Sequence, residues 1–245
     1  MCFSVKIDKD IKRLASNFQA LPDVKSFHEL KSLQNYEKNL SPQELKNSLG
    51  LKRVSKSSCF KTPEDDGVVY PNYFAPVITF DQGRRVVRPM RYRVRPAHSK
   101  EEIPSKYNVF NARIDALESR KTWKGLFMKN HGLFPFYSFY EWVEDQSGKK
   151  RLINFKPNNA KMMWAPCLYD TWTSSDGKIQ FSSFAIITDE PPKEVEEMGH
   201  DRCPIFLRSD KFDSWLDPNK MDKAYAYNIL KQKESTHFES NFPTS

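Results

Sequence analysis

The sequence predicts an α+β fold, a single domain in which helices flank a strongly curved, barrel-like and mostly antiparallel sheet. Two observations predict it: helical patterns gather toward the two ends of the chain, and short strand patterns fill its middle. The chain has 245 residues, enough to enclose a substantial core in one domain spanning 1–245. Its hydrophobic content of 38% and aromatic content of 13% exclude a disordered protein.

An extended helical segment is expected at about residues 8–52. Between residues 9 and 21, apolar side chains recur at three- and four-residue spacing, as on one face of a helix. Residues 41–44 read Ser-Pro-Gln-Glu, which predicts a helix start with Ser41 as its N-cap and a glutamate reaching back to it. Residues 55–67 are rich in Lys, Ser and Asp and predict a loop.

Short strands are expected from residue 68 onward. Residues 77–80 end at the turn signal Asp-Gln-Gly of 81–83, and residues 85–92 follow as a partner strand. Further strands are expected at 133–143, 151–155 and 179–187, helices at 211–216 and 222–231, and an irregular tail at about 234–245.

Net charge, hydropathy and the N-terminal sequence indicate which partners and which compartment to expect. Lys and Arg number 39 against 31 Asp and Glu, and the net charge of +8 favours polyanionic partners without specifying one. No run approaches the roughly 18 apolar residues that cross a bilayer, and the start lacks the features of a signal peptide. We therefore expect a cytoplasmic protein with no membrane partner.

The cysteines predict neither a disulfide framework nor a zinc site, because no two of them are spaced as C-x-x-C and no export signal precedes them. We expect free thiols at Cys2, Cys59, Cys167 and Cys203, and no metal or organic cofactor.

Cys2 is the first candidate for chemistry. Removal of Met1 would leave a terminal cysteine. A free α-amine has a pKa of about 7.7–8.0, and a free thiol has a pKa of about 8.5. Together they form a 1,2-aminothiol, which condenses with aldehydes to a five-membered thiazolidine. Judged from its position alone, an incidental residue at a tolerant chain end is the more common case.

Three internal motifs also carry polar groups suited to chemistry. Asn111 and Arg113 could orient a sugar and grip a phosphate. Glu141 lies among aromatic residues that would desolvate it and suit it to general acid work, although strand alternation equally allows it to face solvent. His200 and Arg202 offer a proton carrier and a second phosphate ligand. Taken alone, the motifs around Asn111 and His200 are more often ordinary surface features, whereas the two interpretations of Glu141 carry about equal weight.

Taken together and in this order, the motifs resemble those of the SOS-response-associated peptidase (SRAP) family. That family begins Met-Cys and then carries Asn-Ala-Arg, aromatic-Glu-Trp and His-x-Arg-x-Pro, which stand here as Met1-Cys2, Asn111-Ala112-Arg113, Tyr140-Glu141-Trp142 and His200-Asp201-Arg202-Cys203-Pro204. Residues 72–76 are similar to its Asn-x-Ala-Pro segment with one residue inserted, and the resemblance covers about 70–216 plus the N-terminus. Phe3 and Ser4 depart from it, because they replace the family's Gly and Arg.

The resemblance implies a DNA-damage response protein that crosslinks itself to abasic sites in single-stranded DNA, as a monomer and in association with the nucleoid. Cys2 would form a thiazolidine with the ring-opened aldehyde, Glu141 would assist ring opening and proton transfer, and Asn111 would hold the ribose. His200 would act on the sugar oxygen or the adjacent phosphate. The residues implied to contact DNA are Arg113, Arg202, Arg88, Arg91, Arg93, Asn72 and Pro76.

The strand around 88–95 adds a pattern of its own. Arg91, Arg93 and Arg95 alternate, which puts three basic groups on one strand face with Arg88 nearby. Such a row predicts either an electrostatic track for DNA or an ordinary solvated face.

Two other functions fit the same residues. One is a cysteine-dependent peptidase or autopeptidase that uses Cys2 on an acyl group. The other is a non-catalytic protein that binds single-stranded nucleic acid through its basic charge and aromatic side chains.

Overall fold

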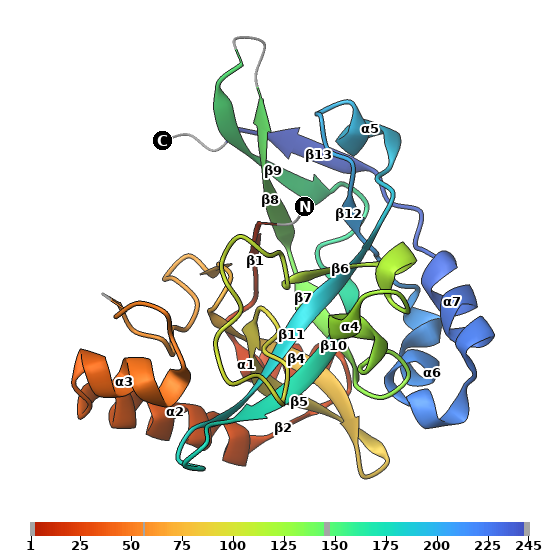
Figure 1. Ribbon diagram of the computed structural model, residues 1–245. Helices are drawn as coiled ribbons and strands as arrows, with labels where there is room; N and C mark the ends of the chain where they lie inside the picture. The colour runs from red at the N-terminus through yellow and green to blue at the C-terminus, as the bar shows by residue number, and fades with distance from the viewer. Residues whose placement is uncertain (1–2, 56, 145–147, 243–245) are drawn as a thin grey trace.

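The structure is a computed structural model that describes residues 3–55, 57–144 and 148–242, and a closed five-stranded barrel lies at its centre (Figure 1). The strands follow the order β11, β10, β7, β4 and β5, and β5 pairs back onto β11 to close the ring. That closing pair is parallel and the other pairings are antiparallel. The barrel strands are β4 (Phe74–Asp81), β5 (Arg84–Tyr92), β7 (His131–Phe136), β10 (Met163–Thr173) and β11 (Gln180–Asp189). The predicted α+β class with a barrel-like, mostly antiparallel sheet is confirmed.

A second, open antiparallel sheet continues from the barrel because only Tyr137 separates β7 from β8. Its strands follow the order β13, β9, β8, β1 and β3. They are β1 (Ser4–Lys6), β3 (Val68–Val69), β8 (Ser138–Glu144), β9 (Lys150–Pro157) and β13 (Phe238–Asn241). The N-terminal strand β1 thus lies directly beside β8, which carries Glu141.

Three short strands extend the barrel sheet. β2 (Leu21–Pro22) pairs with β5, whereas β6 (Asn111–Arg113) and β12 (Cys203–Pro204) both pair with β11. The two strands on β11 carry parts of the motifs singled out from the sequence.

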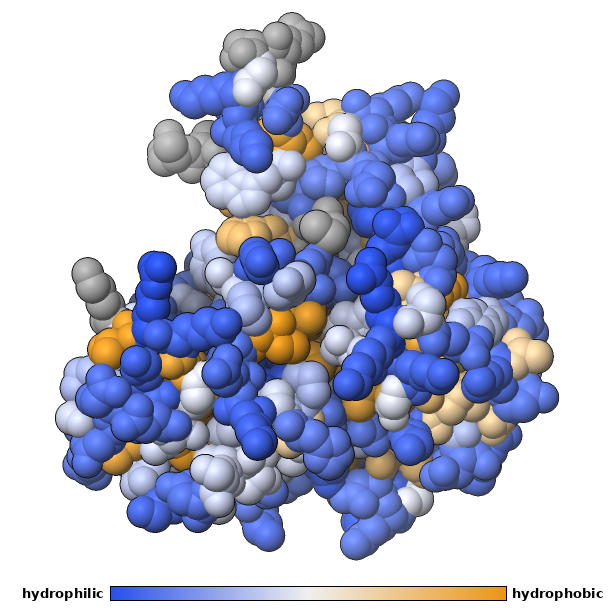
Figure 2. All heavy atoms as spheres, viewed as in Figure 1, coloured by the Kyte–Doolittle hydropathy of each residue, from blue (hydrophilic) through white to orange (hydrophobic). Residues whose placement is uncertain are grey.

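Helices cover the outside of the barrel (Figure 1). The N-terminal group, which occupies the expected helical segment, is α1 (Ile11–Asn17), α2 (Val24–Lys38) and α3 (Pro42–Leu49). The others are α4 (Lys121–Lys124), α5 (Lys193–Glu196), α6 (Phe212–Leu216) and α7 (Lys223–Lys231), with 3₁₀ turns at Ile114–Ala116, Ser209–Lys211 and Pro218–Lys220. Hydrophilic side chains cover most of the visible face of the molecule (Figure 2). None of the helices within the described ranges is long and apolar enough to cross a bilayer.

Local sequence signals explain two of these elements. Ser41 caps α3, and the Glu44 carboxylate accepts from the Ser41 backbone N–H at 2.7 Å, which completes the predicted capping box. The β4–β5 hairpin turns at Gln82 and Gly83, whose φ angles of 48° and 81° are the left-handed values that a two-residue hairpin turn requires.

Three hydrophobic clusters fill the interior. One lies between the barrel and helices α1, α4, α6 and α7, and a second fills the space between the barrel and the β8–β9 sheet around Phe139 and Phe155. The third joins α2 and α3 to the barrel through Phe60, Phe74 and Trp172. The N-terminal helices are therefore part of the packed fold.

Two sequence expectations about the fold need correction. The tail expected to be irregular contains β13, whose residues pair with β9 from Phe238↔Pro157 to Asn241↔Asn154. The longest strand, β10, was missed altogether. It interrupts apolar residues with Pro166 and Asp170, and its extended form depends on pairing with β7 and β11 on its two sides.

Candidate active site

The end of β11 brings two of the sequence motifs together. Thr188 of β11 is paired with Arg113 of β6 on one side and with Pro204 of β12 on the other. Because β6 and β12 flank the same strand, the Asn-Ala-Arg motif and the end of the His-x-Arg-x-Pro motif meet at one edge of the barrel (Figure 1). Strand pairing thus brings together two motifs that lie about ninety positions apart in the sequence.

Asn111 is held inside this edge. Its side chain is buried, and the phenol of the fully buried Tyr92 donates to its Oδ1 at 3.5 Å. Asn108 Oδ1 accepts the backbone N–H groups of Phe110 at 3.2 Å and Asn111 at 3.0 Å, which fixes the entry into β6. Tyr92 and Asn108, which hold Asn111 in place, were not predicted from the sequence. Asn108 could have been, because an Asn whose side chain accepts the backbone N–H two residues later is a common turn signal.

Arg113 and Arg202 share one carboxylate. Asp115 accepts two hydrogen bonds from the half-exposed Arg113 at 2.9 and 2.6 Å, and its Oδ2 lies 3.9 Å from the Arg202 guanidinium. The hydrogen bond from Arg113 holds the pKa of Asp115 below its usual value. The two arginines expected to bind phosphate are therefore neighbours, while their contact with DNA stays a prediction.

Glu141 faces inward, which decides the question that strand alternation left open. Only 3% of the residue is exposed, and burial raises the pKa of its carboxyl to about 8. Its Oε2 lies 3.8 Å from His200 Nε2. Burial also lowers the pKa of His200 to about 4. At pH 7 Glu141 is therefore largely protonated and His200 is neutral, so their contact mainly joins a carboxylic acid to an imidazole rather than two opposite charges.

A tight turn after α5 positions His200. The Gly199 N–H donates to Glu196 O at 2.8 Å, and the Gly199 φ of 86° is a left-handed value that glycine adopts without strain. The ring of His200 then reaches β8, where its Nε2 lies 3.1 Å from Trp142 O. The turn at Gly199 therefore places the His200 imidazole next to β8.

An aromatic cluster lies where the described chain begins. The Phe3 N–H donates to Tyr140 O at 3.0 Å, next to Glu141 in the chain. The Phe3 ring meets Tyr70 and Trp142 edge-on at centroid distances of 6.0 and 6.1 Å. Trp142 is 48% exposed. Cys2, the proposed nucleophile, lies outside the described residues. Sequence reasoning treated Phe3 only as a departure from the family and did not foresee its packing.

The expected electrostatic track is not exposed. Arg91, Arg93 and Arg95 do share one side, but they converge on Glu102, which lies 2.8, 3.0 and 3.5 Å from their guanidinium groups. All three arginines are buried. The expectation of an exposed row was wrong because the loop after β5 folds back and covers it with a carboxylate.

The remaining residues implied to contact DNA lie apart from this row. Arg88 is ion-paired with Asp23 at 2.8 Å and with Asp81, so the nearby member of the expected track is also engaged within the protein. Asn72 is exposed, with a φ of 77°, whereas Pro76 is buried in β4 opposite Pro89. The burial of Pro76 therefore does not support the predicted contact between this residue and DNA.

The three described cysteines carry free thiols, as expected. Burial raises the pKa of Cys59 to about 11 and also raises those of Cys167 and Cys203. A thiol in that state is not a nucleophile at neutral pH. Over the described ranges, no group of three or more His, Cys, Asp or Glu side chains is placed to hold a metal ion.

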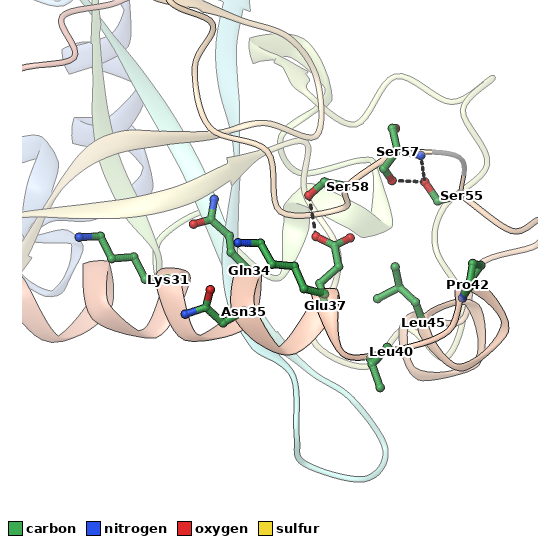
Figure 3. Close-up of a pocket in the computed structure, with 11 residues that line it drawn as sticks. Lys31, Gln34, Asn35, Glu37, Leu40, Pro42, Leu45, Ser55, Ser57 and Ser58 are labelled. Atoms are coloured by element: carbon green, nitrogen blue, oxygen red, sulfur yellow. Dashed lines mark hydrogen bonds between the residues drawn. The ribbon is translucent and has the colours of Figure 1, made fainter.

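A separate hollow of about 590 Å³ lies between α2, α3 and the loop around Ser58 (Figure 3). The Glu37 carboxylate at its wall accepts from the Ser58 hydroxyl and from the Cys59 N–H, each at 2.6 Å. None of the motif residues that the structure describes lines it, and Glu37, the one carboxylate among its described lining residues, already accepts from these two donors. The edge around Glu141 and His200, where the motifs meet, is therefore the better candidate for chemistry.

Comparison with known proteins gives the same family. The sequence profile of the family described as SOS response associated peptidase (SRAP) matches residues 1–241. Abasic site processing protein YoqW of Bacillus subtilis is 25% identical over 181 residues, which cover 71% of this chain and 80% of that protein. Abasic site processing protein HMCES of Gallus gallus is 25% identical over 179 residues, covering 64% of this chain and 53% of that one.

Two crystal structures share the fold. A protein from Bacteroides thetaiotaomicron superposes with a TM-score of 0.69 and covers 100% of this chain and 93% of its own, at 17% identity. A protein from Bordetella bronchiseptica superposes with a TM-score of 0.68 and covers 100% of both chains, also at 17% identity. With the profile matching nearly the whole chain and the motifs present in order, the chain belongs to the SOS response associated peptidase (SRAP) family.

Proposed function

We propose that this protein processes abasic sites in DNA by forming a covalent thiazolidine between Cys2, exposed by removal of Met1, and the ring-opened sugar. The observation that carries the proposal is the buried Glu141, a carboxylic acid at neutral pH that lies against the neutral His200. The names of the relatives, which are abasic site processing proteins, support the substrate. The DNA that it processes is single-stranded, and the protein acts as a monomer.

The reaction needs two nucleophiles on one residue. The Cys2 amine adds to the aldehyde carbon C1′, and the resulting carbinolamine loses water to give a Schiff base. The Cys2 thiolate then adds to the same carbon, the C=N pair moves to nitrogen, and nitrogen takes up a proton. One C–N bond and one C–S bond form, and one water leaves, so no oxidant or reductant is required.

Glu141 supplies the proton that these steps consume. An abasic sugar is mostly a closed ring, and opening it requires protonation of the ring oxygen. Loss of water from the carbinolamine requires protonation of its hydroxyl group. A carboxyl whose pKa is about 8 is largely protonated at pH 7 and can donate in both steps. His200, whose pKa of about 4 keeps it neutral, can accept a proton from a sugar hydroxyl in the same cycle.

The polar groups at the end of β11 bind the rest of the nucleotide. Asn111 offers an amide to the ribose from a position fixed by Tyr92 and Asn108. Arg113 and Arg202, which share Asp115, lie where flanking phosphates can displace that carboxylate and take its hydrogen bonds. Phe3, the first described residue, is anchored next to Glu141 by its backbone hydrogen bond to Tyr140 O.

Incubation with single-stranded DNA that contains one abasic site tests the proposal. The wild-type protein should give an adduct that survives denaturation, Cys2→Ala should give none, and Cys59→Ala, a matched cysteine substitution elsewhere, should react normally. A cysteine peptidase would use the same groups on an acyl carbon and leave no DNA adduct. Equal adduct yield from wild type and Cys2→Ala would refute the assignment of Cys2.

A further inference from the structure

The sheet that carries Glu141 has two unlike faces. Phe139, Glu141 and Val143 of β8 point into the core, so the alternate residues Ser138 and Tyr140 point to the other face. On that other face, the pairings Lys6↔Ser138 and Lys156↔Glu239, with the β8–β9 register of Phe139↔Phe155 extended by one residue, align four side chains in one row across β1, β8, β9 and β13. The row is Lys6, Ser138, Lys156 and Glu239.

A second row runs beside the first one. Tyr140 is paired with Asn154, and Asn154 is paired with Asn241. Both rows line one open groove of about 830 Å³, together with Tyr137 and with the chain at 157–161, which contributes Lys161. The groove therefore combines amides, phenols and lysine side chains on one face of the sheet.

The charge of the groove is positive and unneutralised. Its lining holds three lysines, Lys6, Lys156 and Lys161, against the single carboxylate of Glu239. The ion pairs found among the described residues include none made by these three lysines. By contrast, Arg88, Arg91 and Arg93 are all ion-paired within the protein. The three lysines of the groove are thus available to bind an anion, whereas these three arginines are not.

We propose that this groove is a second contact surface for single-stranded DNA, which holds nucleotides flanking the lesion through phosphate contacts with Lys6, Lys156 and Lys161. This inference rests on the proposed function for its substrate. Tyr140 gives the groove an aromatic surface on which a base can stack. The Tyr140 phenol is neutral at pH 7, as an ordinary tyrosine is, and does not repel phosphate.

The groove lies within reach of the reactive centre. Tyr140 and Glu141 are consecutive and point to opposite faces, and β1 begins beside them at Ser4. Among the described residues, β1 pairs with β8 only from Ser138 to Tyr140, so no described strand lies beside the following part of β8 on that side. A strand whose abasic nucleotide lies at Glu141 can therefore pass around this edge of β8 and continue along the lysine row.

Salt dependence of binding to undamaged single-stranded DNA tests the inference. Each phosphate contact on a single strand contributes about 0.7 to the slope of log K against log salt, so loss of three contacts should lower the slope by about 2. We therefore expect the combined Lys6→Gln, Lys156→Gln, Lys161→Gln variant to bind weakly and with a flatter slope. The adduct yield at saturating abasic DNA should stay at the wild-type level, because Glu141 and His200 are unchanged.

The matched control removes the same charge elsewhere. Lys121, Lys178 and Lys231 are exposed and lie outside the groove, so Lys121→Gln, Lys178→Gln, Lys231→Gln should change the slope far less. Equal slope changes for both variants would overturn the inference, as would tighter groove-dependent binding of RNA than of DNA. Wild-type protein that binds DNA through the groove yet forms no adduct with abasic DNA would refute the proposed function and leave the groove assignment standing.

Discussion

Glu141 Oε2 and His200 Nε2 lie 3.8 Å apart, one on a strand of the open sheet and the other in the turn that follows α5. Burial shifts their pKa values in opposite directions, to about 8 for Glu141 and to about 4 for His200. A proton that an exposed pair would place on the histidine is thus kept on the carboxyl. The site is consequently prepared to donate a proton at neutral pH without carrying a net charge.

The pH dependence of adduct formation should reflect this arrangement. The rate should rise with pH as the Cys2 amine loses its proton at about pH 7.7–8.0. It should fall at higher pH as Glu141, with a pKa of about 8, loses the proton that it must donate. Glu141→Gln should be slower by about 10²–10⁴-fold and should lose the alkaline fall, because glutamine does not titrate. Single-turnover rates between pH 6 and about 10 measure both effects; an alkaline fall that persists in Glu141→Gln would assign it to another group.

Anchoring of the chain start through Phe3 should matter for the rate. Phe3→Gly removes the ring that contacts Tyr70 and Trp142 and restores the residue that the family usually has here. We expect adduct formation to slow by about ten- to a hundredfold, because small displacements of a nucleophile are costly. Phe3→Leu, which keeps apolar packing, should stay within a few-fold of wild type. Quantitative gels of adduct against time distinguish the two, and equal rates for all three proteins would show that the ring does not position the nucleophile.

The turn at Gly199 should contribute both stability and placement of His200. A Cβ at Gly199 would meet no atom within 4 Å, so Gly199→Ala carries only the strain of its φ of 86°. That strain should cost about 1 kcal/mol in the free energy of unfolding. Gly125→Ala is the control, since its Cβ also meets nothing and its φ of −77° suits alanine. Chemical denaturation measures both; a loss of stability as large in Gly125→Ala would mean that φ strain is not the cause.

Glu102 should be the most costly surface-loop carboxylate to remove. It is the shared counter-ion of Arg91, Arg93 and Arg95, and its backbone N–H also donates to Gly50 O at 2.9 Å. Glu102→Gln leaves three buried guanidinium groups without an anion, which should lower the free energy of unfolding by about 3–5 kcal/mol.

The adjacent Glu101 provides the control. Its side chain is 70% exposed and only pairs with Lys52 at 3.8 Å, so Glu101→Gln should cost no more than about 1 kcal/mol. For a chain of this size, the Glu102→Gln loss corresponds to a fall in Tm of about 6–20 °C. Thermal unfolding followed by circular dichroism measures it, and similar Tm values for the two variants would contradict the role assigned to Glu102.

Features that depend on neighbouring residues could be predicted from the sequence. The capping box at Ser41 and Glu44 and the turn at Gly83 are each determined within four residues, and both are present. The burial of Glu141 could not be decided in this way, because it depends on which face of β8 meets Phe155 and His200. Pairing with the partner strand, and not the sequence of β8, sets that face.

The basic residues show the same division. Alternation correctly put Arg91, Arg93 and Arg95 on one side, but the sequence does not reveal that Glu102 covers them from a later loop. The lysine row was missed for a related reason. Lys6 and Lys156 are far apart in the chain, and they share a face only because β1 and β9 both pair with β8.

The central claim is that Cys2, as the first residue of the mature chain, is the residue joined to the abasic sugar. Intact mass spectrometry followed by peptide mapping of the adduct tests this most directly. The account predicts a chain without Met1 whose mass equals protein plus DNA less one water, with the sugar attached to the peptide that begins at Cys2. A retained Met1, or a sugar attached to a lysine, would contradict it.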